Sequence, residues 1–397
     1  FLSAVPVWET LEHHGVRSVV LGVPGTYPPR PLPGALVSGI MTPGMNSPFA
    51  YPASLRDRIQ GWFGTYLFDV TARDPDDPDT LISEIRRMTA QRFELARRLA
   101  GEEEWGFFTM VEMGPDRMHH AFWAQHDPHH PLHDPMGTHH EAIRCYYRFL
   151  DQELGKLLES LPEDTEVCIV SDHGVQPLAG GIAINEWLIA NGHLALHEYP
   201  RRPVRMQQLI EDGGVDWSRT RAWGEGGYYG RVFLNVAGRE PSGVVPAAQY
   251  SSLVAEIASG IGSITDETGC PLRSRALAPA ETYRAVRGIA PDLMAYFGDL
   301  AWRSVGEVGR RRIHVRGASA GPGTANHSQE GIFLRASSRG PAIPRSVLDV
   351  HGYVLKQFGL SQRAAKNPVV WRSLPGRRRS TVSPNASSPE QDAGRRS

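Results

Sequence analysis

Apolar residues recur along the chain with two different spacings, which predict alternating strands and helices. Residues 18–23 and 105–111 are short apolar runs rich in β-branched or aromatic residues, a pattern typical of buried strands. Residues 79–100 and 142–161 place apolar positions three or four apart among charges, so each predicts an amphipathic helix. Residues 167–170 are a further expected buried strand. Strand, helix and strand in this order indicate an α/β fold, with a mainly parallel sheet flanked by helices.

A segment of different composition interrupts this pattern from about residue 196 to residue 290. It combines Gly- and aromatic-rich sequence with an expected strand at 231–236 and an expected helix at 244–261. Buried-strand patterns return after it, so we expect an α+β subdomain inserted into the sheet domain. The predicted organisation is a core that lacks its first strand (1–195), an inserted cap subdomain (196–290), a core continuation (291–372) and a disordered tail (373–397).

Composition and charge limit the classes of partner. The chain carries 42 basic and 43 acidic residues, so nothing global favours nucleic acid or an anionic membrane. No apolar run approaches the roughly 18–20 residues that a membrane span requires. The tail is rich in Arg, Ser and Pro and almost lacks apolar residues, which is typical of disorder. The sequence does not specify an oligomeric state.

Cysteine usage gives the only indication of the compartment. The chain has 3 cysteines without a close C-x-x-C pair, which argues against a disulfide framework and against a thiolate zinc site. A reducing cytoplasm fits this usage best. The chain begins at Phe1 without a charged start or a cleavage site, so we expect that it is cut from a longer sequence and that an export signal could have been lost.

Two segments that follow expected strands carry side chains suited to metal binding. Asp172 and His173 come directly after the strand at 167–170, where a glycine lets the backbone turn sharply. Asp116 and His120 are four residues apart, so a helix that begins here presents both on one face. His119 then points elsewhere, because neighbouring residues of a helix cannot aim at one point.

A third segment supplies one more imidazole. His327 stands in a Gly-rich loop just before an expected strand at 331–334. Two carboxylates and three imidazoles suit zinc, with manganese or iron as alternatives, whereas calcium prefers more oxygen ligands.

These three segments, in this order, resemble the alkaline phosphatase superfamily. The similarity is to its type I phosphodiesterase/nucleotide pyrophosphatase branch, which includes predicted phosphohydrolase/phosphomutase proteins. It covers nearly everything up to Leu360. Apart from the three segments that carry the metal-ligand candidates, the similar segments are residues 23–29, 37–43, 185–188, 235–241 and 243–245.

The resemblance implies a two-metal site and a phosphohydrolase activity. Asp116, His120 and His327 are implied to hold one divalent ion, and Asp172 and His173 a second. The family completes the second site with an Asp and with a Thr or Ser nucleophile. Both are expected in a segment that precedes Phe1, so the chain as given is expected to be inactive.

The implied substrate is a small-molecule phosphate ester, and the ions are expected to be zinc. Two alternatives stay open: a phosphomutase of the same superfamily and a non-catalytic binding protein.

Other positions are candidates for substrate contact or for catalysis. Arg30 and Arg239 suit a phosphate or carboxylate of the substrate, although each could equally form a structural salt bridge. Thr26 is an alternative nucleophile, because residues 26–30 are similar to the sulfatase signature with a Thr where that signature needs Cys or Ser. The histidines of 126–140 favour a loop near the mouth of an active site over a metal cluster, with substrate contact by one of them as a further alternative.

Overall fold

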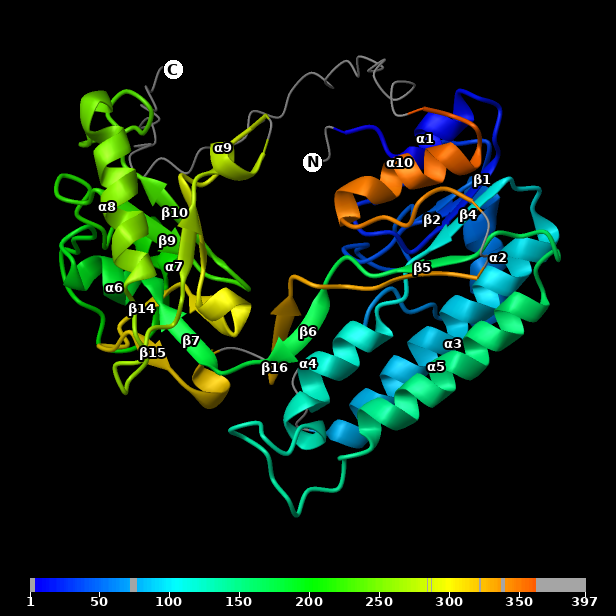
Figure 1. Cartoon of the computed structure of the whole chain (residues 1–397), viewed down its shortest axis with the longest axis horizontal. Helices are drawn as coiled ribbons and strands as arrows, with labels where there is room; N and C mark the ends of the chain where they lie inside the picture. The colour runs from blue at the N-terminus through cyan, green and yellow to red at the C-terminus, as the bar shows by residue number, and fades with distance from the viewer. Residues whose placement is uncertain are drawn as a thin grey trace, which may run out of the picture. The chain divides into compact units, whose positions relative to one another are not determined.

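The structure is a computed structural model that describes residues 4–71, 77–283, 285–286, 288–320, 323–336 and 340–361. These residues form two compact units, one drawn from 1–177 and 322–371 and the other from 178–321 (Figure 1). We describe each unit by itself. The expected disordered tail, 373–397, lies outside the described residues. Within the described ranges, no helix has the length and apolar character needed to cross a bilayer.

A four-stranded sheet lies at the centre of the first unit. Its strand β1 (Ser18–Leu21) lies between β2 (Gly34–Val37) and β4 (Phe107–Met110) and pairs in parallel with both. β3 (Ala50–Tyr51) adds to β2 in the antiparallel sense. All four residues of β1 are buried, in agreement with its run of β-branched residues. The predicted α/β fold is confirmed.

Helices flank this sheet, and two of them match the predicted helical patterns closely. α3 (Pro78–Glu102) begins where the Asp77 side chain accepts a hydrogen bond from the Thr80 amide. α5 (Ala142–Glu159) packs against α3 and α4, so both of the predicted amphipathic helices turn an apolar stripe inward. The remaining helices of this unit are α1 (Val7–Glu12), α2 (Ala53–Phe63), α4 (Gly114–His126) and α10 (Val347–Gln357).

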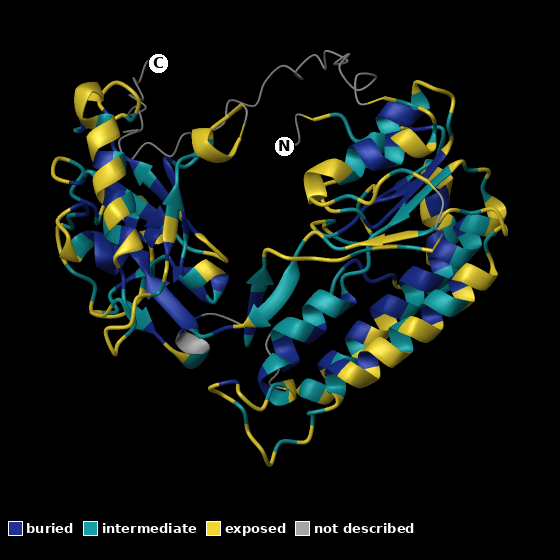
Figure 2. Cartoon of the chain, viewed as in Figure 1, coloured by how far each residue is buried: buried dark blue, intermediate teal, exposed yellow. Residues whose placement is uncertain are grey.

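The strand β5 (Cys168–Val170) departs from the prediction. We expected a buried parallel strand, but β5 pairs antiparallel with β17 (Phe333–Arg335), and all three of its residues are exposed (Figure 2). β5 is exposed because, among the described residues, β17 is its only partner strand and the other edge of β5 is not paired. A second ribbon, of β6 (Gly174–Pro177) and β16 (Ala325–Ser328), follows directly along the chain.

The second unit covers residues 178–321 and so extends beyond both ends of the insertion that we expected at 196–290. Its buried strand β7 (Gly180–Ala183) pairs with β13 (Trp302–Val305) and with β15 (His314–Val315). These pairings join segments on both sides of the expected insertion. β12 (Leu293–Tyr296), which follows the expected insertion, also belongs to this unit, whereas β17 belongs to the first unit.

A four-stranded antiparallel sheet and several helices complete the second unit. The sheet has the order β11 (Arg275–Leu277), β12 (Leu293–Tyr296), β10 (Gly230–Leu234) and β9 (Ala222–Glu225), and α8 (Tyr250–Gly262) contacts β11 and β12. The other elements of this unit are α6 (Ile184–Ala190), β8 (Val204–Arg205), α7 (Met206–Glu211), α9 (Pro279–Thr282) and β14 (Glu307–Val308).

Candidate metal centre

The first turn of α4 positions the central carboxylate of the site. The Glu112 carboxylate accepts a hydrogen bond of 2.7 Å from the Gly114 amide, which is one of the unpaired donors at the start of the helix. The same carboxylate accepts from the hydroxyl of Thr89 at 2.9 Å. These bonds tie the start of α4 to α3, and Asp116 follows in the same turn.

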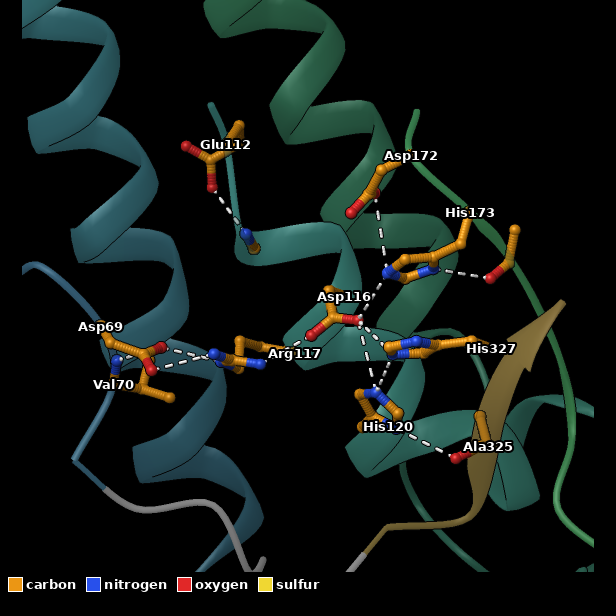
Figure 3. Close-up of polar contacts among 12 residues, drawn as sticks. Asp69, Val70, Glu112, Asp116, Arg117, His120, Asp172, His173, Ala325 and His327 are labelled. Carbon is orange, nitrogen blue, oxygen red and sulfur yellow. Dashed lines mark hydrogen bonds and ion pairs between the residues drawn. The ribbon is translucent and has the colours of Figure 1, made fainter. Parts of the chain in front are cut away.

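Two imidazole nitrogens lie close to one carboxylate oxygen of Asp116 (Figure 3). Its Oδ1 lies 3.3 Å from Nε2 of His120 and 3.5 Å from Nε2 of His327. The two imidazole nitrogens lie 3.2 Å apart. Ligands bound tetrahedrally to zinc at about 2.0–2.1 Å are about 3.3–3.4 Å from one another. The three separations therefore fit one ion of this kind.

His173 and Asp172 lie beside this group. Nε2 of His173 is 4.0 Å from Oδ1 of Asp116 and 3.6 Å from Oδ1 of Asp172. The His173 ring stacks on the His327 ring with centroids 3.6 Å apart. Asp116, His173 and His327 each offer one ligand atom, and these atoms lie within 4.8 Å of one another. The structure thus brings Asp116, His120, His173 and His327 together, and Asp172 lies next to them through its neighbour His173. The division of these residues between two ions stays a prediction.

Backbone carbonyls fix the orientation of two of the imidazoles. Nδ1 of His120 lies 3.0 Å from the Ala325 carbonyl oxygen, and Nδ1 of His173 lies 2.9 Å from that of Gly174. Since a carbonyl oxygen only accepts, each Nδ1 carries the hydrogen, and in the neutral ring Nε2 offers its lone pair. The Gly174 carbonyl is adjacent to His173 in the sequence, whereas the Ala325 carbonyl is 205 positions from His120, so no local pattern could predict that partner.

A second feature that the sequence did not reveal is the support of Asp116 by Arg117. The Arg117 guanidinium donates to Oδ2 of Asp116 at 2.6 Å and binds both carboxylate oxygens of Asp69, at 2.7 and 2.9 Å. Burial raises the pKa of Asp116, but the nearby imidazoles of His120 and His327 and the charge of Arg117 outweigh it, so this pKa lies well below its usual range. Asp116 is therefore ionised.

The neighbouring imidazole of His119 lies in different surroundings. Its ring stacks on Tyr147, and its Nε2 lies 3.1 Å from the Tyr147 hydroxyl. Burial lowers the pKa of His119 to about 4. His119 is therefore a neutral residue that packs against Tyr147.

The remaining candidates make structural contacts within their own compact units. Arg239 forms a bidentate ion pair with Asp292, with both distances 2.7 Å, which is the structural role that the sequence left open. Arg30 forms an ion pair with Glu9 at 3.3 Å. The Thr26 hydroxyl donates to the Val23 carbonyl at 2.7 Å and accepts from the Gly39 amide at 3.2 Å. These bonds connect the two ends of the segment 23–39.

Comparison with protein families identifies the chain at family level. The model of the type I phosphodiesterase/nucleotide pyrophosphatase family matches residues 1–321, which include four of the five candidate ligands; His327 follows the matched region. No curated protein matches the chain. The chain therefore belongs to the type I phosphodiesterase/nucleotide pyrophosphatase family of the alkaline phosphatase superfamily, a family of metal-dependent enzymes that act on small phosphate esters.

Proposed function

We propose that this protein hydrolyses phosphate esters of small molecules, in the manner of a phosphodiesterase or nucleotide pyrophosphatase, with two divalent ions. The observation that carries the proposal is the set of donor separations around Asp116, at 3.2, 3.3 and 3.5 Å. Two acceptor nitrogens and an ionised carboxylate at these separations suit zinc, with manganese or iron as alternatives.

In the proposed arrangement, Asp116, His120 and His327 hold one ion, and Asp172 and His173 hold the other. Bound ions of this kind neutralise charge on the phosphoryl oxygens and lower the pKa of a nucleophile. The protein residues keep the ligands in place before substrate arrives. Asp116 is held by Arg117, and the rings of His120 and His173 are held through their Nδ1 atoms.

Metal analysis and ester hydrolysis test this proposal together. We expect His327→Ala to lower the zinc content and, in the full-length protein, to abolish hydrolysis of bis-p-nitrophenyl phosphate, while the variant His119→Ala keeps both. Comparison with p-nitrophenyl phosphate separates a diesterase from a monoesterase, and return of the phosphoryl group to the same substrate would identify a mutase. Unchanged zinc in His327→Ala would refute the proposed ligand set.

The nucleophile is tested separately. Because the Thr26 hydroxyl is already used within its loop, we propose that it does not attack the phosphate. Trapping of a phosphorylated enzyme followed by peptide mass spectrometry identifies the attacking hydroxyl. A phosphate on Thr26 would contradict this part of the proposal.

We also propose a cellular compartment and a domain organisation for the protein. Cys145, Cys168 and Cys270 are all exposed and unpaired, which fits a reducing cytoplasm. We further propose that the second compact unit is the inserted subdomain predicted from the sequence.

A further inference from the structure

A pocket of about 440 Å³ lies within the second unit. Proteins bind small molecules in pockets of about 300–1,000 Å³, so this pocket has room for a small ligand. Among the lining residues that the structure describes, none is a candidate metal ligand. The lining combines α6, a residue that precedes β8 and the segment that leads into β15, and it includes Glu186, Ile189, Tyr199, Arg311, Arg312 and Ile313.

One buried carboxylate fixes the wall of this pocket. The side chain of Glu186 accepts hydrogen bonds of 2.8 Å from the amides of Gly309 and Arg310. It also accepts from the Tyr199 hydroxyl at 2.7 Å, and that hydroxyl accepts from the Arg311 amide at 2.9 Å. These bonds tie the loop that precedes β15 to α6. Three protein donors thereby satisfy the negative charge of Glu186.

Arg311 has a backbone conformation that residues with a side chain rarely adopt. Its φ is 55°, in the left-handed region. Such strain persists only where the surroundings hold it, and it is concentrated at ligand sites. Here the Arg311 amide is bonded to Tyr199, and the guanidinium carbon lies 4.8 Å from the centroid of the Tyr199 ring. The strained residue and the ring that holds it both line the pocket.

Two arginines of the lining carry charges that no carboxylate pairs with. The neighbouring Arg310 differs, because its guanidinium donates to the Glu307 carboxylate at 3.0 Å. Within the part of the chain that the structure describes, the guanidinium groups of Arg311 and Arg312 form neither a hydrogen bond nor an ion pair. Both residues are exposed. Since the protein itself satisfies Glu186, the pocket offers positive charge to a ligand.

From these observations we propose that the pocket binds a small organic anion. The guanidinium groups of Arg311 and Arg312 hold its carboxylate or phosphate, because the planar guanidinium fork matches both groups. Ile189 and Ile313 supply apolar surface for the rest of the ligand. The proposal does not depend on the metal centre. The competing explanation is that Arg311 only packs on Tyr199 and that both arginines are solvated surface residues.

Calorimetric titration with three probes tests the preference for an anion. Benzoate and phenylphosphonate carry different anionic groups on the same ring, and benzyl alcohol is an uncharged counterpart. At low ionic strength, where charges are least screened, we expect saturable binding of at least one anion and none of benzyl alcohol. Tighter binding of benzoate assigns a carboxylate ligand, and tighter binding of phenylphosphonate assigns a phosphate. Absence of anion binding, or equal binding of benzyl alcohol, would overturn the proposal.

Two variants locate the bound anion. Arg311→Gly removes one charge and keeps the loop conformation, since glycine adopts a φ of 55° readily. Arg312→Gln removes the other charge. The matched control is Arg273→Gly, because Arg273 is exposed, has a φ of 56° and does not line the pocket.

We expect Arg311→Gly and Arg312→Gln each to bind the anion about 10–100-fold more weakly, because each loses hydrogen bonds to a charged group. Arg273→Gly should bind as the parent does, and so should His327→Ala, which alters the candidate metal centre. Equal affinity of the two pocket variants and the Arg273→Gly control would overturn the proposal. Loss of binding in His327→Ala would place the anion at the metal centre and would overturn it equally.

A second measurement avoids substitution altogether. Phenylglyoxal modifies accessible guanidinium groups, and peptide mass spectrometry locates the modified residues. Saturating benzoate or phenylphosphonate should protect Arg311 and Arg312 in the unaltered protein but leave Arg273 reactive. Equal modification of Arg311 and Arg312 with and without the anion would contradict the proposed site, even if the variants fail to fold.

Discussion

Arg117→Gln tests whether the carboxylate at the metal centre depends on its support. Arg117 joins Asp116 to a second carboxylate, that of Asp69. The side chains of Arg117 and Asp69 are only 11% and 13% exposed. Removing one partner of a largely buried ion pair costs about 3–5 kcal/mol of unfolding free energy, because the other charge is left without compensation.

Two effects on metal affinity oppose each other in this variant. Loss of the bond to Oδ2 frees the Asp116 carboxylate to rotate, and loss of such supporting contacts typically weakens metal binding about 10–100-fold. Loss of a positive charge beside the site would strengthen cation binding. Asp69 already compensates this charge through two hydrogen bonds, so we expect the orientation effect to dominate.

The assay is competition for zinc against a chromophoric chelator, alongside urea unfolding. The matched control is Arg97→Gln, since Arg97 also pairs with a buried carboxylate, Glu153 at 3.0 Å, but touches no candidate ligand. We expect both variants to be destabilised and only Arg117→Gln to bind zinc about 10–100-fold more weakly. Equal or tighter zinc binding by Arg117→Gln than by the control would refute the reasoning.

Three further predictions follow from other contacts. His120→Ala should lose zinc while His119→Ala does not, because only Nε2 of His120 faces Asp116; equal loss in both, measured by elemental analysis, would mean that the helix face is misassigned. Burial holds the pKa of His193 below 6.5, so the unfolded chain binds its proton first, and stability should fall as pH drops below about 6.5; urea unfolding of His193→Gln should show a smaller fall, and an unchanged pH dependence would count against it. Ile332 is an apolar side chain that is 55% exposed, and exposed apolar surface promotes aggregation, so Ile332→Lys should reduce the aggregation measured by light scattering. The unfolding free energy should change by less than about 0.5 kcal/mol, because the site is on the surface. Unaltered aggregation would show that the exposed Ile332 side chain is not its cause.

Local sequence patterns predicted the parts of this fold that depend on local contacts. The helical spacing of apolar residues located α3 and α5, and the run of β-branched residues located β1. The four-residue spacing of Asp116 and His120 likewise indicated a shared helix face, and the structure places their donor atoms 3.3 Å apart. In each case the relevant neighbours lie within a few residues along the chain.

Features that depend on distant pairing could not be predicted in this way. The burial of β5 was overestimated because its apolar run does not reveal how many strands pair with it. The limits of the second unit depend on the pairing of β7 with β13, which are separated by more than a hundred residues. The carbonyl of Ala325 and the carboxylate of Asp69 are also remote in sequence, by 205 and 48 positions, from the side chains that they orient.

The attachment of Arg117 also limits how Asp116 can coordinate an ion. One carboxylate oxygen faces the imidazoles, while the other is occupied by the guanidinium at 2.6 Å. Asp116 can therefore act as a monodentate ligand without rearrangement, but bidentate coordination would require it to give up Arg117. Large cations such as calcium reach their usual six to eight ligands partly through bidentate carboxylates, whereas zinc is satisfied with four. Arg117 would thereby limit the denticity of Asp116 toward a bound ion and disfavour calcium at the proposed site.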